Sequence, residues 1–199
     1  MTSTLDAALA YAQRGWRVIP IPPGMKHPNM PRWQWEATAD ADVVARWWTY
    51  RFNGYGIGIA TGATSGIFVL DVDDDGDVHR GSDTLADLEA TYGPLPETYE
   101  VLTPRGGRHL YFAWPECPAC AGGRMFLDRA PAVCALCGGK GVEIRHAQAG
   151  RLGPDLDIRG EGGQVLAPPT IGVNGVAYEV GRGCDEVAPA PEWLVQLLT

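Results

Sequence analysis

The sequence predicts a mixed α+β fold, because it contains both helical and strand-like apolar patterns. Helical patterns cover residues 4–14, 40–50 and 82–92, and a last helix begins at Pro191. Short apolar runs bounded by Gly or Pro are typical of strands, and they occupy residues 16–21, 55–60, 67–72, 100–103, 109–113, 141–145, 156–159, 164–167 and 176–180. The length allows one large domain or two small ones.

The individual elements follow from their side-chain spacing. The apolar stripe of the first helix contains Leu5, Ala8, Leu9 and Ala12. Gly15 ends this helix, and a strand and then a loop at residues 22–33 follow it. The strands at 55–60 and 67–72 are separated only by a turn, so we expect them to pair as a hairpin.

The strand at residues 67–72 leads into an acidic cluster. A strand has a side-chain period of two, so Asp71 and Asp73 project from one face and Val72 from the other. Two carboxylates at one edge are hard oxygen ligands that suit Mg²⁺ or Mn²⁺. Such ions most often bind substrate phosphates, so the pattern favours phosphoryl or nucleotidyl transfer.

Two other interpretations of this cluster stay open. Aspartates after a strand often form only a solvated turn. Asp71, Asp73 and Asp75 followed by Gly76 also match the opening of a calcium-binding loop. The last ligand position of that loop holds Ser82 instead of a bidentate Glu, and the preceding segment is strand-like, which argues against calcium.

The charge of the chain is segregated. The formal net charge is -8, and residues 71–100 contain ten acidic side chains with Arg80 as their only base. Residues 105–159 carry eight Lys or Arg against five Asp or Glu. An acidic segment suited to metals therefore adjoins a mildly basic segment suited to phosphates, which keeps a nucleic-acid partner open.

The composition is that of an ordinary globular protein, with 45% hydrophobic and 20% charged residues. No apolar run approaches the roughly 20 residues needed to cross a bilayer. The segment Met1–Asp6 lacks the basic start and apolar stretch of a signal peptide. We therefore expect a cytoplasmic protein with no membrane partner.

Four of the five cysteines form two CxxC pairs separated by thirteen residues, and they are Cys117, Cys120, Cys134 and Cys137. Disulfides are not expected in a cytosolic chain, and two CxxC pairs supply the four thiolates of a tetrahedral Zn²⁺ site. Such a zinc is structural because it has no open ligand position. We predict a zinc-binding insertion over residues 114–141; a set of redox thiols is the alternative, and Cys184 is left unassigned.

Motifs along nearly the whole chain resemble the Prim-Pol (bifunctional DNA primase/polymerase) family of the archaeo-eukaryotic primase superfamily. These motifs are Gly58–Gly62 with Ser65–Gly66, the strand ending in Asp71–Asp73, Leu95–Thr98, Thr103–Phe112, Asp157–Gly163 and Ala167–Thr170. Their order and spacing carry the resemblance. It implies one catalytic domain over residues 1–199, in which an RRM-like catalytic sheet joins an N-terminal α/β unit and the active site lies in the cleft between them.

The resemblance also implies residue roles. Asp71, Asp73 and Asp157 are the catalytic carboxylates that bind Mg²⁺ or Mn²⁺, and His109 is catalytic through contact with the phosphates of the incoming nucleotide. Further nucleotide-binding candidates are Lys26, Arg105, Gly106, Gly107, Arg108 and Arg159. The two glycines allow close approach of the backbone. Arg159 lies two residues after Asp157, so pairing with a metal carboxylate is an alternative role.

The implied activity is that of a DNA primase and DNA polymerase. It transfers nucleotides from nucleoside triphosphates by a two-metal mechanism on a single-stranded DNA template, in plasmid- or phage-type replication. The family often has Glu where this chain has Asp73, a shorter arm that still ligates. Family members commonly continue into a helicase domain, so a helicase domain or protein is a further expected partner. A metal-dependent nuclease and a zinc-containing single-stranded nucleic-acid-binding module remain as alternatives.

Overall fold

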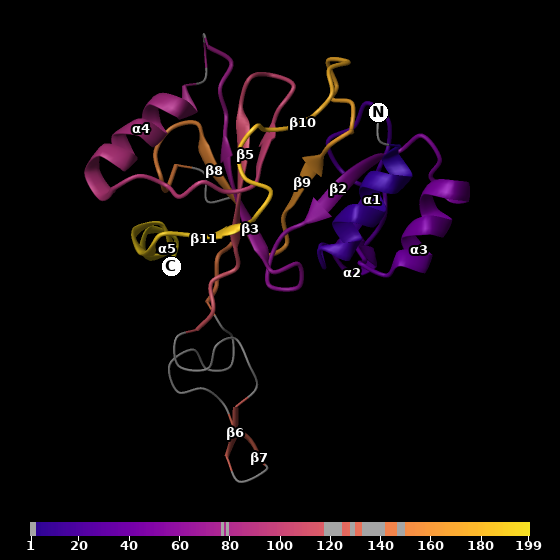
Figure 1. Cartoon of the computed structure of the whole chain (residues 1–199), viewed down its shortest axis with the longest axis horizontal. Helices are drawn as coiled ribbons and strands as arrows, with labels where there is room; N and C mark the ends of the chain where they lie inside the picture. The colour runs from indigo at the N-terminus through magenta and orange to yellow at the C-terminus, as the bar shows by residue number, and fades with distance from the viewer. Residues whose placement is uncertain are drawn as a thin grey trace.

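The computed structural model describes residues 3–76, 78, 80–117, 125–127, 130–132, 142–146 and 150–199. The helices are α1 (Thr4–Gln13), α2 (Trp33–Glu36), α3 (Ala41–Arg46), the π-helical turn η1 (Trp47–Arg51), α4 (Gly81–Tyr92) and α5 (Glu192–Leu198). The strands are β1 (Val18–Ile21), β2 (Gly56–Ala60), β3 (Ile67–Val72), β4 (Glu100–Leu102), β5 (Arg108–Ala113), β6 (Met125–Leu127), β7 (Ala130–Ala132), β8 (Leu156–Arg159), β9 (Gln164–Ala167), β10 (Glu179–Val180) and β11 (Ala188–Pro189). They form a mixed α+β fold with mostly antiparallel sheets, which confirms the predicted class (Figure 1).

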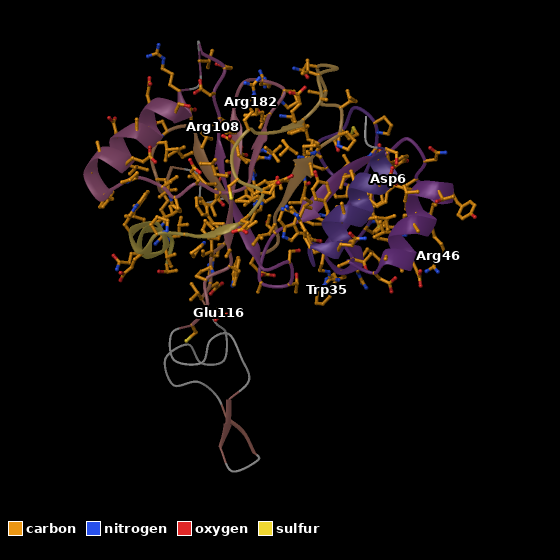
Figure 2. All side chains as sticks on the ribbon, viewed as in Figure 1. Asp6, Trp35, Arg46, Arg108, Glu116 and Arg182 are labelled. Atoms are coloured by element: carbon orange, nitrogen blue, oxygen red, sulfur yellow. The ribbon has the colours of Figure 1, made fainter. Side chains whose placement is uncertain are left out.

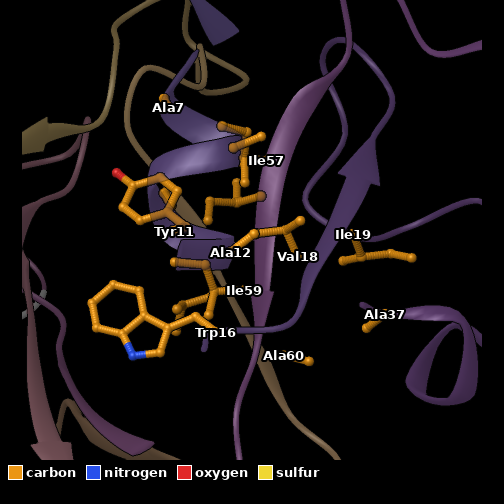
Figure 3. Packing of buried hydrophobic residues seen from close by; sticks show 14 of the residues in the cluster. Ala7, Tyr11, Ala12, Trp16, Val18, Ile19, Ala37, Ile57, Ile59 and Ala60 are labelled. Atoms are coloured by element: carbon orange, nitrogen blue, oxygen red, sulfur yellow. The ribbon is translucent and has the colours of Figure 1, made fainter. Parts of the chain in front are cut away.

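The smaller sheet has the strand order β1-β2-β9, and both of its pairings are antiparallel. Ser3 caps the start of helix α1: its hydroxyl accepts the N–H of Asp6 at 3.1 Å and so satisfies one of the free donors of the first turn. The buried side of α1 shares a core with Ile57 and Ile59 of β2 (Figure 3). Helix α1, helix α3 and this sheet make up the N-terminal unit.

The larger sheet has the order β10-β4-β5-β3-β8, and β11 pairs in parallel with β5. All six residues of β3 are buried, because β3 lies inside the sheet between β5 and β8 and a hydrophobic core covers each of its faces. Phe68, Leu70 and Val72 share a core with α4 and α5, whereas Val69 shares a core with the N-terminal unit. Because side chains alternate along a strand, Asp71 points to the same side as Val69, toward the N-terminal unit.

Four aromatic side chains connect the N-terminal unit to the larger sheet. The ring of Trp16 stacks on Tyr11 of α1 at 5.8 Å and on Tyr111 of β5 at 5.4 Å. The ring of Tyr99 meets Trp16 and Tyr111 edge-on at 5.4 and 5.0 Å. These four residues, which we call the aromatic cluster, hold the two sheets against each other.

The predicted hairpin of residues 55–60 and 67–72 is wrong. Strand β2 pairs with β1 and β9, and β3 pairs with β5 and β8 of the other sheet. Only an isolated bridge between Gly62 and Ile67 joins the two segments. Gly62 and Gly66 have φ angles of +123° and +68°, so the turn between them redirects the chain from one sheet into the other.

The region predicted to hold zinc is described only in part. Cys117 is buried, while Cys120, Cys134 and Cys137 lie outside the described residues. The backbones of β6 and β7 pair with each other. The strand expected at 141–145 is reduced, over its described part, to one bridge between Arg145 and Glu161. Among the helices described, none is long and apolar enough to cross a membrane.

Candidate active site

The centre of the larger sheet brings three of the predicted catalytic residues together. Asp71 on β3 lies directly opposite His109 on β5 and, on its other side, opposite Asp157 on β8. Side chains at directly opposed positions have Cβ atoms about 4.5–5.5 Å apart. Asp73 follows β3 and faces the same cleft as Asp71. Residues that lie 88 positions apart in the chain, Asp71 and Arg159, are also in contact here.

Arg159 lies between two of the carboxylates. Its Nη2 and Nε atoms donate to Oδ2 of Asp71 at 2.8 and 3.2 Å, and its Nη1 atom lies 3.2 Å from Oδ2 of Asp157. Burial acts to lower the pKa of Arg159, but the charge of Asp71 and then that of Asp157 outweigh it, so the pKa is raised. Of the two roles that the sequence left open for Arg159, carboxylate pairing is the one seen in this structure.

His109 packs into the wall of the cleft with only 6% of its surface exposed. Its Nε2 atom lies 3.4 Å from Oδ1 of Asp71. Burial lowers the pKa of His109, and the opposing effect of Asp71 does not restore it. Since the unperturbed pKa of histidine is about 6.5, the ring is neutral at pH 7 and has one N–H donor.

A cleft of about 340 Å³ opens over Asp71, Asp73, His109 and Arg159. Of the predicted site residues, those that line it are Lys26, Asp71, Asp73, Arg105, His109 and Arg159. Lys26 is exposed, and its loop is attached to β9 because its carbonyl accepts a hydrogen bond from the Gln164 side chain at 2.8 Å. Aspartates and basic groups therefore face one another across the same space, as the segregated charge of the sequence predicts.

Four predicted active-site residues do not line the cleft: Asp157, whose Oδ2 atom pairs with Arg159, and three nucleotide-binding candidates. Arg108 precedes His109 on β5, so it points to the opposite face, where its Nη1 atom lies 3.5 Å from Oε1 of Glu100. Gly106 and Gly107 pack against the backbone of the acidic segment: a Cβ at Gly106 would lie 3.0 Å from the Asp74 carbonyl oxygen. A Cβ at Gly107 would overlap the carbonyl oxygen of Val72. The two glycines therefore allow β5 and the turn before it to approach the backbone of the acidic segment closely.

Sequence reasoning did not select His27, Trp33, His146 and Tyr178, which also line the cleft. His27 adjoins Lys26, and that adjacency was the only available signal. Tyr178 packs on His109 with ring centroids 5.8 Å apart. Burial, and then the charges of Asp71 and Asp73, raise the pKa of Tyr178 to about 12, so its hydroxyl keeps its proton and can donate a hydrogen bond.

The predicted metal-binding carboxylates are of the ligand type that suits a divalent cation, but in this structure two of them pair with Arg159. Asp71, Asp73 and Asp157 offer the hard oxygen ligands that Mg²⁺ and Mn²⁺ require. Within the part of the chain that the structure describes, no group of three or more His, Cys, Asp or Glu side chains has the geometry of a metal site. In this structure the guanidinium of Arg159 contacts oxygens of both Asp71 and Asp157.

The fold and the charged cleft define a mixed α+β protein suited to a phosphorylated substrate. Comparison with protein families matches residues 8–193 to Prim-Pol, described as "Bifunctional DNA primase/polymerase, N-terminal". The chain belongs to this family, and the resemblance drawn from its motifs is confirmed. A search of curated proteins found no match. Membership implies a nucleotidyltransferase-type enzyme with DNA primase/polymerase activity that acts on DNA and nucleotides, in a family that typically uses divalent metals.

Proposed function

We propose that this protein synthesises primers and extends them on single-stranded DNA, with nucleoside triphosphates as substrates and Asp71, Asp73 and Asp157 as its catalytic carboxylates. The observation that carries the proposal is the pairing of Asp71 with both His109 and Asp157 across adjacent strands beneath the cleft. Carboxylates from separate parts of the chain meet there, which a solvated turn after β3 does not require. Plasmid- or phage-type replication, with a helicase as partner, is the setting that we infer for it.

When Mg²⁺ or Mn²⁺ is bound by these three carboxylates, it supplies a Lewis acid that favours the 3′-hydroxyl nucleophile and neutralises charge on the phosphates. The chain's own side chains do the remaining work. Lys26 and Arg105 line the cleft and bind the triphosphate as cations. His109 is neutral and donates one hydrogen bond to a phosphate oxygen, while the cleft wall holds its ring in place.

The remaining predicted elements are part of the same proposal. The larger sheet acts as an RRM-like catalytic sheet, and the region 114–141 holds one structural Zn²⁺ through Cys117, Cys120, Cys134 and Cys137. The whole of residues 1–199 is one catalytic domain. Its route to single-stranded DNA is along the basic side chains at the cleft, since phosphate backbones are bound mainly by Lys and Arg.

Primer synthesis on unprimed single-stranded DNA tests the proposal. The wild-type protein, Asp73→Asn and Arg46→Gln are compared with Mg²⁺ or Mn²⁺ and with ribo- or deoxyribonucleoside triphosphates. Arg46 is exposed on α3, far from the larger sheet (Figure 2), so its variant controls for loss of a charge. Product from the wild type and Arg46→Gln, but not from Asp73→Asn, supports the proposal.

Other results of this assay contradict it. Cleavage of the template that depends on Asp73 indicates a nuclease in which the same carboxylates activate water. DNA binding that is equal in all three proteins, with no product at all, indicates a binding module. Circular dichroism of Asp73→Asn establishes that any loss of product is not a loss of fold.

A further inference from the structure

The ion-pair network beneath the cleft uses the oxygens that a metal would need. Arg159 directs Nη2 and Nε to Oδ2 of Asp71 and Nη1 to Oδ2 of Asp157. Oδ1 of Asp71 faces His109, and Oδ1 of Asp157 accepts the N–H of Ile158 at 2.8 Å. Each carboxylate thus has one oxygen against the guanidinium and the other against a neutral group.

This network is largely buried, so its charges are screened less than those of exposed side chains. The side chains of Asp71, Asp157 and Arg159 are 9%, 18% and 27% exposed. Two carboxylates at directly opposed strand positions repel each other unless a cation lies between them. The planar fork of Arg159 meets this requirement with one charge and three donors. Arg159 therefore stands where a divalent cation would neutralise the same pair.

We propose that Arg159 is an internal counter-ion that competes with the divalent metal for Asp71 and Asp157, and that metal binding displaces its guanidinium from them. The identity of the metal rests on the proposed function, whereas the competition is a property of the free protein. Arg159 is half-buried on the surface of the cleft, and its side chain is long and has several rotatable bonds. Once released, the guanidinium lies in a cleft wall that also contains Lys26, His27 and His146, where it can pair with a triphosphate.

Such an exchange couples two events that a polymerase must combine. A metal takes over the carboxylates, and a cation becomes free for the nucleotide at the same moment. In the absence of both, the carboxylates remain paired, and the site does not accumulate unbalanced negative charge. Arg159 is accordingly a positioning residue in the free protein and a candidate triphosphate ligand in the loaded one.

Mn²⁺ affinity, measured by electron paramagnetic resonance without nucleotide or DNA, tests the competition. Arg159→Gln removes the competitor, so we expect it to bind Mn²⁺ about tenfold more tightly than wild type, within the range of typical couplings between sites. Lys26→Gln removes the same charge from the same cleft without touching the carboxylates, and we expect less than about a twofold change because exposed charges are screened. In Asp71→Asn/Arg159→Gln the gain disappears.

A second measurement follows the guanidinium itself. In ¹⁵N NMR of the wild-type protein, Mg²⁺ titration is expected to shift the Nε–H resonance of Arg159, because that donor leaves Asp71. An unmoved resonance at saturating Mg²⁺, an Arg159→Gln affinity equal to or below wild type, or an equal gain in Lys26→Gln each overturns the proposal. None of these readouts involves primer synthesis. A protein that makes no primers can still show the competition, and an active primase can fail to show it.

Discussion

Replacing Gly107 with alanine should displace the proposed catalytic carboxylates without changing any of them. A Cβ at Gly107 would overlap the carbonyl oxygen of Val72 and would lie 3.2 Å from both the backbone nitrogen of Asp74 and Oγ1 of Thr103. The first two of these atoms belong to the backbone on either side of Asp73, so no side-chain rotation relieves the clash. Either β5 or the segment that carries Asp73 has to move.

The size of the effect follows from this geometry. Overpacking at a tight site costs about 1–3 kcal/mol, and for a chain of this length each 1 kcal/mol lowers the Tm by about 2–4 °C. We therefore expect Gly107→Ala to melt roughly 2–12 °C below wild type. A displacement of about 1 Å in a catalytic group costs about 10²-fold in rate, so primer synthesis should fall by about that factor at temperatures where both proteins are folded.

Thermal unfolding followed by circular dichroism, with primer synthesis on the same samples, measures both effects. Gly183→Ala is the matched control, since its Cβ would meet only the Thr98 carbonyl oxygen at 3.8 Å, and we expect a change within about 0.5 kcal/mol. A Gly107→Ala protein that melts with wild type and makes primers at the wild-type rate would refute the argument that this turn sets the position of Asp73.

Three further predictions concern stability and metal content. Tyr111→Phe removes a buried hydroxyl with no hydrogen-bond partner among the described residues. At pH 7 the free energy of unfolding of the variant should therefore equal that of wild type or exceed it by up to about 3 kcal/mol. Burial raises the pKa of Tyr111 well above 10, so its titration has no effect on stability below pH 10, and above it ionisation in the unfolded chain lowers the free energy of unfolding by about 1.4 kcal/mol per pH unit; denaturant titrations from pH 9 to 11 should show a shallower loss in Tyr111→Phe. Asp40→Ala deletes the cap that accepts N–H groups of Asp42 and Val43 at 2.9 and 3.1 Å, and should lower the free energy of unfolding by about 1 kcal/mol in urea melts. Elemental analysis should find one zinc per chain, which Cys134→Ser loses and Cys184→Ser keeps; retention of zinc by Cys134→Ser would contradict the predicted site.

Local patterns in the sequence were sufficient for the elements that carry the site. The period of two along residues 67–72 predicted a strand that presents Asp71 on one face, and the structure has that strand. The same period, applied to β5, separates Arg108 from His109, but the prediction followed the family motif and grouped Arg108 with the nucleotide-binding residues, which the structure does not support.

Local patterns could not predict which strands pair with each other or which distant segments pack around the cleft. Strand β2 has the alternation of a hairpin strand, but Ile57 and Ile59 enter the core of the N-terminal unit, and this burial outweighs the short turn to β3. Tyr178 and His146 reach the cleft only because strands and loops distant in sequence pack together, and nothing at those positions marks them in advance. The pairing of Arg159 depended on where β8 docks.

The aromatic cluster has a consequence for how substrates enter. Tyr11, Trp16, Tyr99 and Tyr111 are each less than one-tenth accessible, and swinging the N-terminal unit away from the larger sheet would expose them all. Exposing each ring costs about 1.5 kcal/mol or more, so opening costs on the order of 6 kcal/mol. Roughly one molecule in ten thousand is then in the open conformation. The width of the cleft is thus set during folding, and we do not expect a hinge between the N-terminal unit and the larger sheet to control access to it.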